Sequence, residues 1–116
     1  MFKHVLIPTD GSKLSNEAVE AGVRFAKALG ARVTGYFAAP AATPIVYANF
    51  LPVGLMQPEK HARLIAKAAK QYLSVIEEAA RKSGVACEVM HTTDDYPADA
   101  ILKVAKQKRC DVIFIS

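Results

Sequence analysis

The residues best suited to chemistry lie in one short stretch, residues 5–12, which reads VLIPTDGS. A continuous apolar run is typical of a strand covered on both faces, as in the middle of a parallel sheet. Pro8 ends such a strand by removing a hydrogen-bond donor, and Gly11 permits a tight turn. Because ligands bind at the carboxyl ends of strands in open α/β sheets, Asp10 is predicted to face a small molecule there.

Local structural roles compete with this interpretation of Asp10. Its carboxylate could instead accept hydrogen bonds from the backbone N–H groups of Gly11 to Lys13 and cap the following helix. Ser12 and Ser15 are interpreted as helix caps and not as nucleophiles, because no histidine is placed to activate them. From the residues alone, both interpretations of Asp10 stay open.

Metal and disulfide chemistry are not indicated by the spacing of the candidate residues. The histidines share no ligand spacing and are scattered at His4, His61 and His91. Three acids of one segment fit a turn followed by the first turn of a helix better than a cation site; they are Asp94, Asp95 and Asp99. The unrelated positions of Cys87 and Cys110 fit reduced, buried thiols better than a disulfide.

The composition fits one small domain. A chain of 116 residues that is 52% hydrophobic can bury one core. No apolar run approaches the roughly 20 residues that span a bilayer, and the N-terminus enters a strand without a signal-peptide core, so we expect a cytoplasmic protein without a membrane partner. The net charge is +4, but no aromatic residues interleave with the basic ones, so no nucleic-acid partner is expected.

Hydrophobic periodicity predicts strands and helices in strict alternation. The first helix is expected to end at Gly30, and Pro58 and Pro97 are expected to open the next two. After the opening strand, the predicted elements are a helix over 12–30, a strand over 32–39, a helix over 58–83, an edge strand over 85–92, a short helix from Pro97 and a buried strand over 111–115. The predicted apolar stripes of the helices are Leu14, Ala18, Ala21, Phe25 and Leu29; Leu64, Ala68, Tyr72 or Leu73, Ile76 and Ala79 or Ala80; and Ile101, Leu102 and Ala105.

Residues 40–58 interrupt this alternation with four prolines and several large apolar side chains. Loops of this length are usually functional. The apolar content argues against a solvated linker, because such linkers lack large side chains. We therefore expect this loop to pack over the edge of the sheet or against a protein partner.

Alternating strands and helices predict a doubly wound α/β fold with a parallel sheet and helices on both faces. If the last strand lies beside the first, Ser116 comes next to Asp10 at the switch point of the sheet. A doubly wound sheet normally follows each inner strand with a covering helix. Residues 1–116 are therefore expected to form a single domain that is incomplete at its C-terminus.

Three segments of the chain follow a shared pattern: the opening KHVLIPTDGS at 3–12, the Pro97-x-x-x-Ile101 segment, and the ending CDVIFIS at 110–116. Together with the long crossover helix, they make the whole chain resemble a bacterial universal stress protein. The resemblance implies a Rossmann-like open sheet with the strand order 3-2-1-4-5. The 116 residues would supply the order 3-2-1-4, with the fifth strand missing.

In one branch of that family, the resemblance implies ATP binding. The corner at residues 8–10 matches the segment that lies against adenosine, and Ala38 matches the residue whose backbone contacts adenine. Ile115 and Ser116 occupy the first positions of the glycine-rich loop that holds the triphosphate, with Ser116 where the first glycine would be. The implied nucleotide-binding residues are Pro8, Thr9, Asp10, Ala38, Ile115 and Ser116. Because backbone N–H groups of that loop cradle phosphate, the 116 residues alone are expected to bind ATP, with or without Mg²⁺, weakly or not at all.

Two functions follow from the resemblance. The first is a stress-response protein that binds an adenine nucleotide at the carboxyl ends of strands one and four in its complete form, and hydrolyses it slowly at most. The alternative is a family member that binds no nucleotide and acts as a dimeric protein-interaction module through the 40–58 loop. A homodimer is expected in both cases. An enzyme is less well supported, because no nucleophile and base can be paired from these residues.

Overall fold

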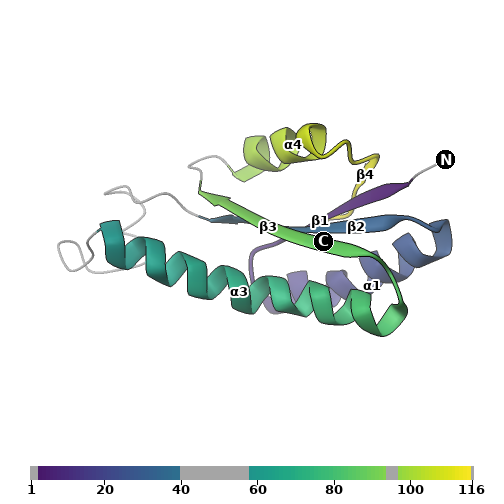
Figure 1. Ribbon diagram of the computed structural model, residues 1–116, viewed down its shortest axis with the longest axis horizontal. Helices are drawn as coiled ribbons and strands as arrows, with labels where there is room; N and C mark the ends of the chain where they lie inside the picture. Colours follow the sequence, from purple (N-terminus) through teal and green to yellow (C-terminus); the bar gives the residue numbers. More distant parts are fainter. Residues whose placement is uncertain (1–2, 40–57, 94–96, 116) are drawn as a thin grey trace.

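The computed structural model describes residues 3–39, 58–93 and 97–115. Strands and helices alternate along the described chain, as the sequence predicts (Figure 1). The elements are β1 (His4–Thr9), α1 (Lys13–Leu29), β2 (Arg32–Ala39), α3 (Pro58–Ser83), β3 (Cys87–Thr93), α4 (Pro97–Gln107) and β4 (Val112–Ile113).

The four strands form one parallel sheet in the order β3-β2-β1-β4. Figure 1 shows α1 and α3 side by side on one face of the sheet and α4 on the other face. The predicted fold class, the parallel sheet and its strand order are therefore confirmed. The prediction that the last strand lies beside the first is also confirmed, because Val5 of β1 pairs with Val112 of β4.

The larger apolar core lies between the sheet and the pair α1 and α3. Alternate residues of the strands point into it, since side chains alternate between the two faces of a strand. The largest of its fully buried side chains are Val5, Ile7, Val19, Val23, Val33 and Ile76. The sheet and α3 approach closely at Gly35, where a Cβ atom would lie 2.9 Å from Cδ1 of Ile76. A side chain in place of this hydrogen would push α3 away from β2.

The smaller apolar core lies on the other face, beneath α4. Leu6 of β1 and Tyr36 of β2 are both fully buried there. The helix contributes small or branched residues to this core, namely Ala100, Val104 and Ala105. Both faces of β1 and β2 are therefore covered, which explains the continuous apolar runs in their sequences.

The predicted helix faces are confirmed in part. In α3, Leu73, Ile76 and Ala80 are buried in the larger core, and in α4 Ala105 is buried in the smaller core with Ile101 packed against it, whereas α1 buries a neighbouring face. One residue of each predicted stripe is nevertheless exposed: Leu14, Leu64 and Leu102 are 65%, 50% and 61% exposed, respectively. The buried residues of α1 are instead Ser15, Val19, Gly22, Val23 and Ala26. Small residues let a helix lie close to a sheet, and the buried face of α1 accordingly combines serine, glycine and alanine with two valines, while Leu14 is exposed.

The observed ends of the helices and strands can be compared with the predicted ones. Ser12 caps the start of α1, and Gly30 ends that helix in the left-handed conformation at φ 66°, as predicted. The edge position of β3 is also correct, although the strand begins at Cys87. The last strand is shorter than predicted and only half-buried, because β4 forms the other edge of the sheet. Residues 40–57 of the loop predicted over 40–58 lie outside the described residues, and α3 begins at Pro58.

The two cysteines were predicted to be reduced, buried thiols. Cys87 and Cys110 are both free and half-buried. Burial, followed by the nearby charge of Glu77, raises the pKa of Cys87 to about 11, so this thiol stays protonated at neutral pH.

Among the helices that the structure describes, none combines the length and the apolarity needed to cross a membrane.

Candidate functional site

The candidate site lies at the carboxyl ends of β1, β2 and β4. The ladder between β1 and β2 ends at the pair Thr9 and Phe37, so Ala38 is the next residue of β2 toward this edge. Ile115 lies two residues beyond the last paired residue of β4, Ile113, toward the same edge. Five of the six predicted residues therefore reach one edge of the sheet. The sixth, Ser116, lies outside the described residues.

Asp10 follows β1 directly and one of its carboxylate oxygens is used locally. Oδ1 accepts a hydrogen bond from the backbone N–H of Ser12 at 2.9 Å and one from the hydroxyl of Ser15 at 2.8 Å. Both of these bonds go to Oδ1, and the hydroxyl of Ser12 also lies near the carboxylate. The side chain is exposed. The local role predicted for Asp10 is therefore confirmed, because one of its oxygens accepts hydrogen bonds at the start of α1. Its predicted contact with a ligand stays a prediction.

The helix cap itself belongs to Ser12. Its hydroxyl oxygen accepts a hydrogen bond from the backbone N–H of Ser15 at 3.1 Å. This bond satisfies one of the backbone donors that the first turn of a helix leaves without a partner. The predicted capping role of Ser12 is confirmed, whereas Ser15 uses its hydroxyl on Asp10.

Hydrogen bonding lowers the pKa of Asp10 below its usual value. The hydroxyl and the backbone N–H of Ser12 contribute most, followed by the hydroxyl of Ser15, while partial burial acts in the opposite direction. These donors stabilise the ionised form. At neutral pH, Asp10 therefore presents an acceptor-only carboxylate at the edge of the sheet.

Gly11 is required by the geometry of this corner. Its φ angle is +80°, and a Cβ atom there would lie 2.5 Å from the ring of Tyr72 in α3. Its N–H donates to Oγ1 of the buried Thr9 at 3.1 Å. The ring of Tyr72 also meets Phe37 of β2 edge-on, with 5.1 Å between the centroids. One aromatic side chain from α3 thus supports the ends of both β1 and β2.

Ala38 offers its backbone carbonyl on the side of β2 that faces β1. Its strand partner is Thr92 of β3, and β1 ends before reaching it. The side chain is half-buried. Ala38 lies one residue beyond the last pair of the β1 ladder, so its backbone carbonyl is the group that is placed to accept a hydrogen bond from a ligand.

The described residues include histidine, cysteine and acidic side chains that could in principle bind a metal ion. In the ranges 3–39, 58–93 and 97–115, no three His, Cys, Asp or Glu side chains gather in a way that could hold an ion. Asp99 lies in the first turn of α4 and is exposed, where an acid stabilises the helix dipole. Asp94 and Asp95 lie outside the described residues.

A comparison with protein-family models gives one match, to the model described as "Universal stress protein family", over residues 1–116. The chain belongs to the universal stress protein family. The resemblance carried by the opening and closing segments is therefore confirmed. A comparison with curated protein sequences found no match.

Solved structures of other universal stress proteins share the fold at low sequence identity. A family protein from Burkholderia pseudomallei superposes with a TM-score of 0.80 at 15% identity, over 99% of this chain and 81% of that one. A protein from Arabidopsis thaliana with AMP bound gives 0.68 at 15% identity, over 97% and 75%. A protein from Archaeoglobus fulgidus in complex with dAMP gives 0.61 at 18% identity, over 99% and 80%.

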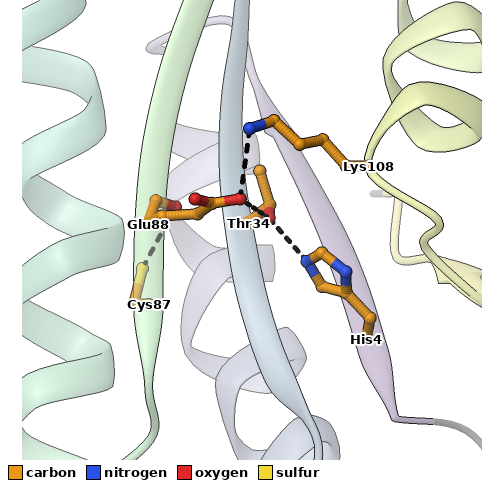
Figure 2. Close-up of polar contacts among 5 residues, drawn as sticks. All are labelled: His4, Thr34, Cys87, Glu88 and Lys108. Atoms are coloured by element: carbon orange, nitrogen blue, oxygen red, sulfur yellow. Dashed lines mark hydrogen bonds and ion pairs between the residues drawn. The ribbon is translucent and has the colours of Figure 1, made fainter.

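A second polar cluster lies at the opposite end of the sheet in this universal stress protein. Figure 2 shows a chain of contacts that links three strands and the end of α4. Nε2 of His4 lies 2.6 Å from Oγ1 of Thr34, and that hydroxyl donates to Glu88 at 3.2 Å. The ammonium of Lys108 lies 3.5 Å from the same carboxylate oxygen of Glu88. Because the threonine hydroxyl donates to Glu88, it accepts from His4, so Nε2 carries the proton.

From the sequence, His4 was considered only as a metal ligand, and the sequence did not reveal this cluster. The side chain is buried, and its Nδ1 has no hydrogen-bond partner among the described residues. Burial, followed by the charge of Arg32, lowers the pKa of His4, while the Lys108 carbonyl and the carboxylates of Glu88 and Asp111 oppose this shift. The signal that was available is the strand register, because Thr34 and Glu88 are direct partners on β2 and β3.

Proposed function

We propose that this member of the family binds an adenine nucleotide at the carboxyl ends of β1, β2 and β4. The observation that carries the proposal is the exposed carboxylate of Asp10, which follows β1 directly and is held at Oδ1 by Ser12 and Ser15. Two proteins of the same fold support the choice of ligand, since one is described with AMP bound and another in complex with dAMP.

The corner is suited to the nucleoside part of such a ligand. An ionised carboxylate accepts hydrogen bonds from hydroxyl or amino groups, and bonds to a charged group are stronger than neutral ones. The backbone carbonyl of Ala38, at the same edge of the sheet, supplies a further acceptor. The negative charge of Asp10 disfavours phosphate at the same point. We therefore expect the 116 residues to bind adenosine and AMP more tightly than ATP, with or without Mg²⁺.

Isothermal titration calorimetry tests the proposal. AMP is titrated into the wild-type chain and into Asp10→Ala, which removes the carboxylate. A lost hydrogen bond to a charged group corresponds to about a 10- to 100-fold loss of affinity. Asp99→Ala is the matched control, since it removes another exposed acid from the start of a helix. Failure of the wild-type chain to bind adenosine or AMP would rule the proposal out.

The nucleotide is proposed to be a ligand and not a substrate. Both serines of the corner have structural hydrogen bonds, because Ser12 caps α1 and Ser15 donates to Asp10. Hydrolysis of ATP is therefore expected to be slow at most, which phosphate release over hours would check. A stress-response role and a homodimer are proposed from the family alone, and multi-angle light scattering measures the second directly.

A further inference from the structure

The hydroxyl of Ser15 is committed to Asp10 by its surroundings. Ser15 lies in the first turn of α1 and is only 8% exposed. Its backbone N–H is already satisfied by the hydroxyl of Ser12, so its own hydroxyl is not needed as a cap. That hydroxyl donates to Oδ1 of Asp10 at 2.8 Å. If the carboxylate turned away, the Ser15 hydroxyl would lose this partner with little access to water.

The two donors on Oδ1 fix the orientation of the carboxylate. The N–H of Ser12 and the hydroxyl of Ser15 both reach the same oxygen, at 2.9 and 2.8 Å. A carboxylate held at one oxygen by two donors from different directions cannot rotate without breaking one of them. Oδ2 is therefore left in a constant position, although the side chain as a whole is exposed.

We propose that Ser15 is a positioning residue of the nucleotide site, which holds the Asp10 carboxylate so that Oδ2 accepts a hydrogen bond from a hydroxyl group of the ligand. This inference rests on the proposed function, because the ligand is the adenine nucleotide of that site. Ser15 acts through Asp10. The benefit is preorganisation, since a fixed acceptor does not lose side-chain freedom when the ligand binds.

The test compares Ser15→Ala with Ser15→Thr, which keeps the hydroxyl, and with Ser74→Ala as the matched control. Ser74 also donates to a single oxygen from a helix, but its bond is to the exposed carbonyl of Gln71. AMP affinity is measured by calorimetry, and the pKa of Asp10 is followed by the NMR shift of its carboxyl carbon. Ser15→Ala should lower the affinity by about 5- to 10-fold and raise the pKa of Asp10. Ser15→Thr and Ser74→Ala should stay within about twofold of wild type in affinity.

The two measurements separate failure of this inference from failure of the proposed function. If wild type binds AMP and Ser15→Ala binds it equally well, the positioning role is overturned. A loss of thermal stability with an unchanged pKa of Asp10 also overturns it, because a purely structural hydroxyl would give that result. If wild type does not bind AMP, the proposed function fails. The pKa of Asp10 in Ser15→Ala then decides by itself whether the serine holds the carboxylate.

Discussion

The two faces of the sheet are held by different kinds of interaction. Between the sheet and the helices α1 and α3, the core contacts are apolar and closely packed, and Ile76 lies against Gly35. Beneath α4, a smaller apolar cluster is continued by the hydrogen-bonded chain of His4, Thr34 and Glu88 (Figure 2). Apolar packing is large in free energy but weakly directional, whereas hydrogen bonds are directional and modest in net free energy. The first face therefore supplies most of the stability, and the second fixes how three strands and α4 are aligned.

The largest expected effect is on the α3 face. Ile76→Ala removes a fully buried side chain and should lower the free energy of unfolding by about 3–4 kcal/mol, measured by urea denaturation. Leu64→Ala is the control in the same helix, because Leu64 is half exposed and its loss should cost less than about 1 kcal/mol. Equal effects of the two substitutions would mean that α3 does not pack on the sheet as described.

The close contact between Gly35 and Ile76 gives a second test of the α3 face. A Cβ atom there meets Cδ1 and Cγ2 of Ile76 at 2.9 and 3.0 Å, so Gly35→Ala should destabilise the wild-type chain by about 1–3 kcal/mol. The same substitution should cost clearly less in the Ile76→Ala background, where both atoms are gone. A double-mutant cycle of unfolding free energies measures the coupling. Additive effects would contradict the close approach of α3 to β2.

The next effect is on the α4 face. Thr34→Val keeps the shape of the side chain but leaves the Nε2–H group of His4 without an acceptor. Leaving a buried donor unpaired should lower the free energy of unfolding by about 1–3 kcal/mol. Thr93→Val, at an exposed position of β3, should cost less than about 0.5 kcal/mol. If Thr34→Val proves as stable as wild type, the polar chain contributes nothing to this face.

The two faces should also differ in their response to acid. The lowered pKa of His4 means that the unfolded chain takes up its proton more readily than the folded chain. Stability should therefore be unaffected by this group well above its usual pKa of 6.5 and should fall as the pH drops through that value toward the folded pKa. His4→Gln should reduce this loss between pH 7 and 5, as measured by thermal unfolding at each pH. An unchanged pH dependence would place the response on another group.

The smallest expected effect concerns the ion pair at the end of the same chain. The side chains of Lys108 and Glu88 are 40% and 56% exposed, so water and salt screen their attraction. Lys108→Met should change the free energy of unfolding by less than about 0.5 kcal/mol, and the difference should shrink in high salt. A larger effect that persists in salt would show that the pair matters more than its exposure suggests.

The sequence predicted the fold well because its strongest signals are local. Apolar runs, a serine cap and a glycine helix end each depend on a few neighbouring residues, and the order of the strands followed from the alternation of elements and the resemblance. The helix faces were predicted less well. Leu14, Leu64 and Leu102 satisfy the helical spacing, yet all three are exposed, and the buried face of α1 includes the small residues Ser15 and Gly22. In α3, the predicted residues Leu73 and Ile76 are buried.

The sequence predicted where the candidate site lies but not which side chains contact one another there. The chain order brings Asp10, Ala38 and Ile115 to one edge, which the topology confirms. The bond from Ser15 to Asp10 depends on side-chain conformation, which spacing does not reveal. The contact between His4 and Thr34 joins residues 30 positions apart, and only the strand register shows that they lie on the same face.

The ring of Tyr72 lies against Gly11 at the end of β1 and meets Phe37 near the end of β2. These two strand ends supply different parts of the proposed site, and a single side chain from a third element touches both. Any enlargement at one of them must move that ring and so disturb the other. A larger residue in place of Gly11 should therefore disturb the end of β2 as well as the end of β1, because both ends share the ring of Tyr72.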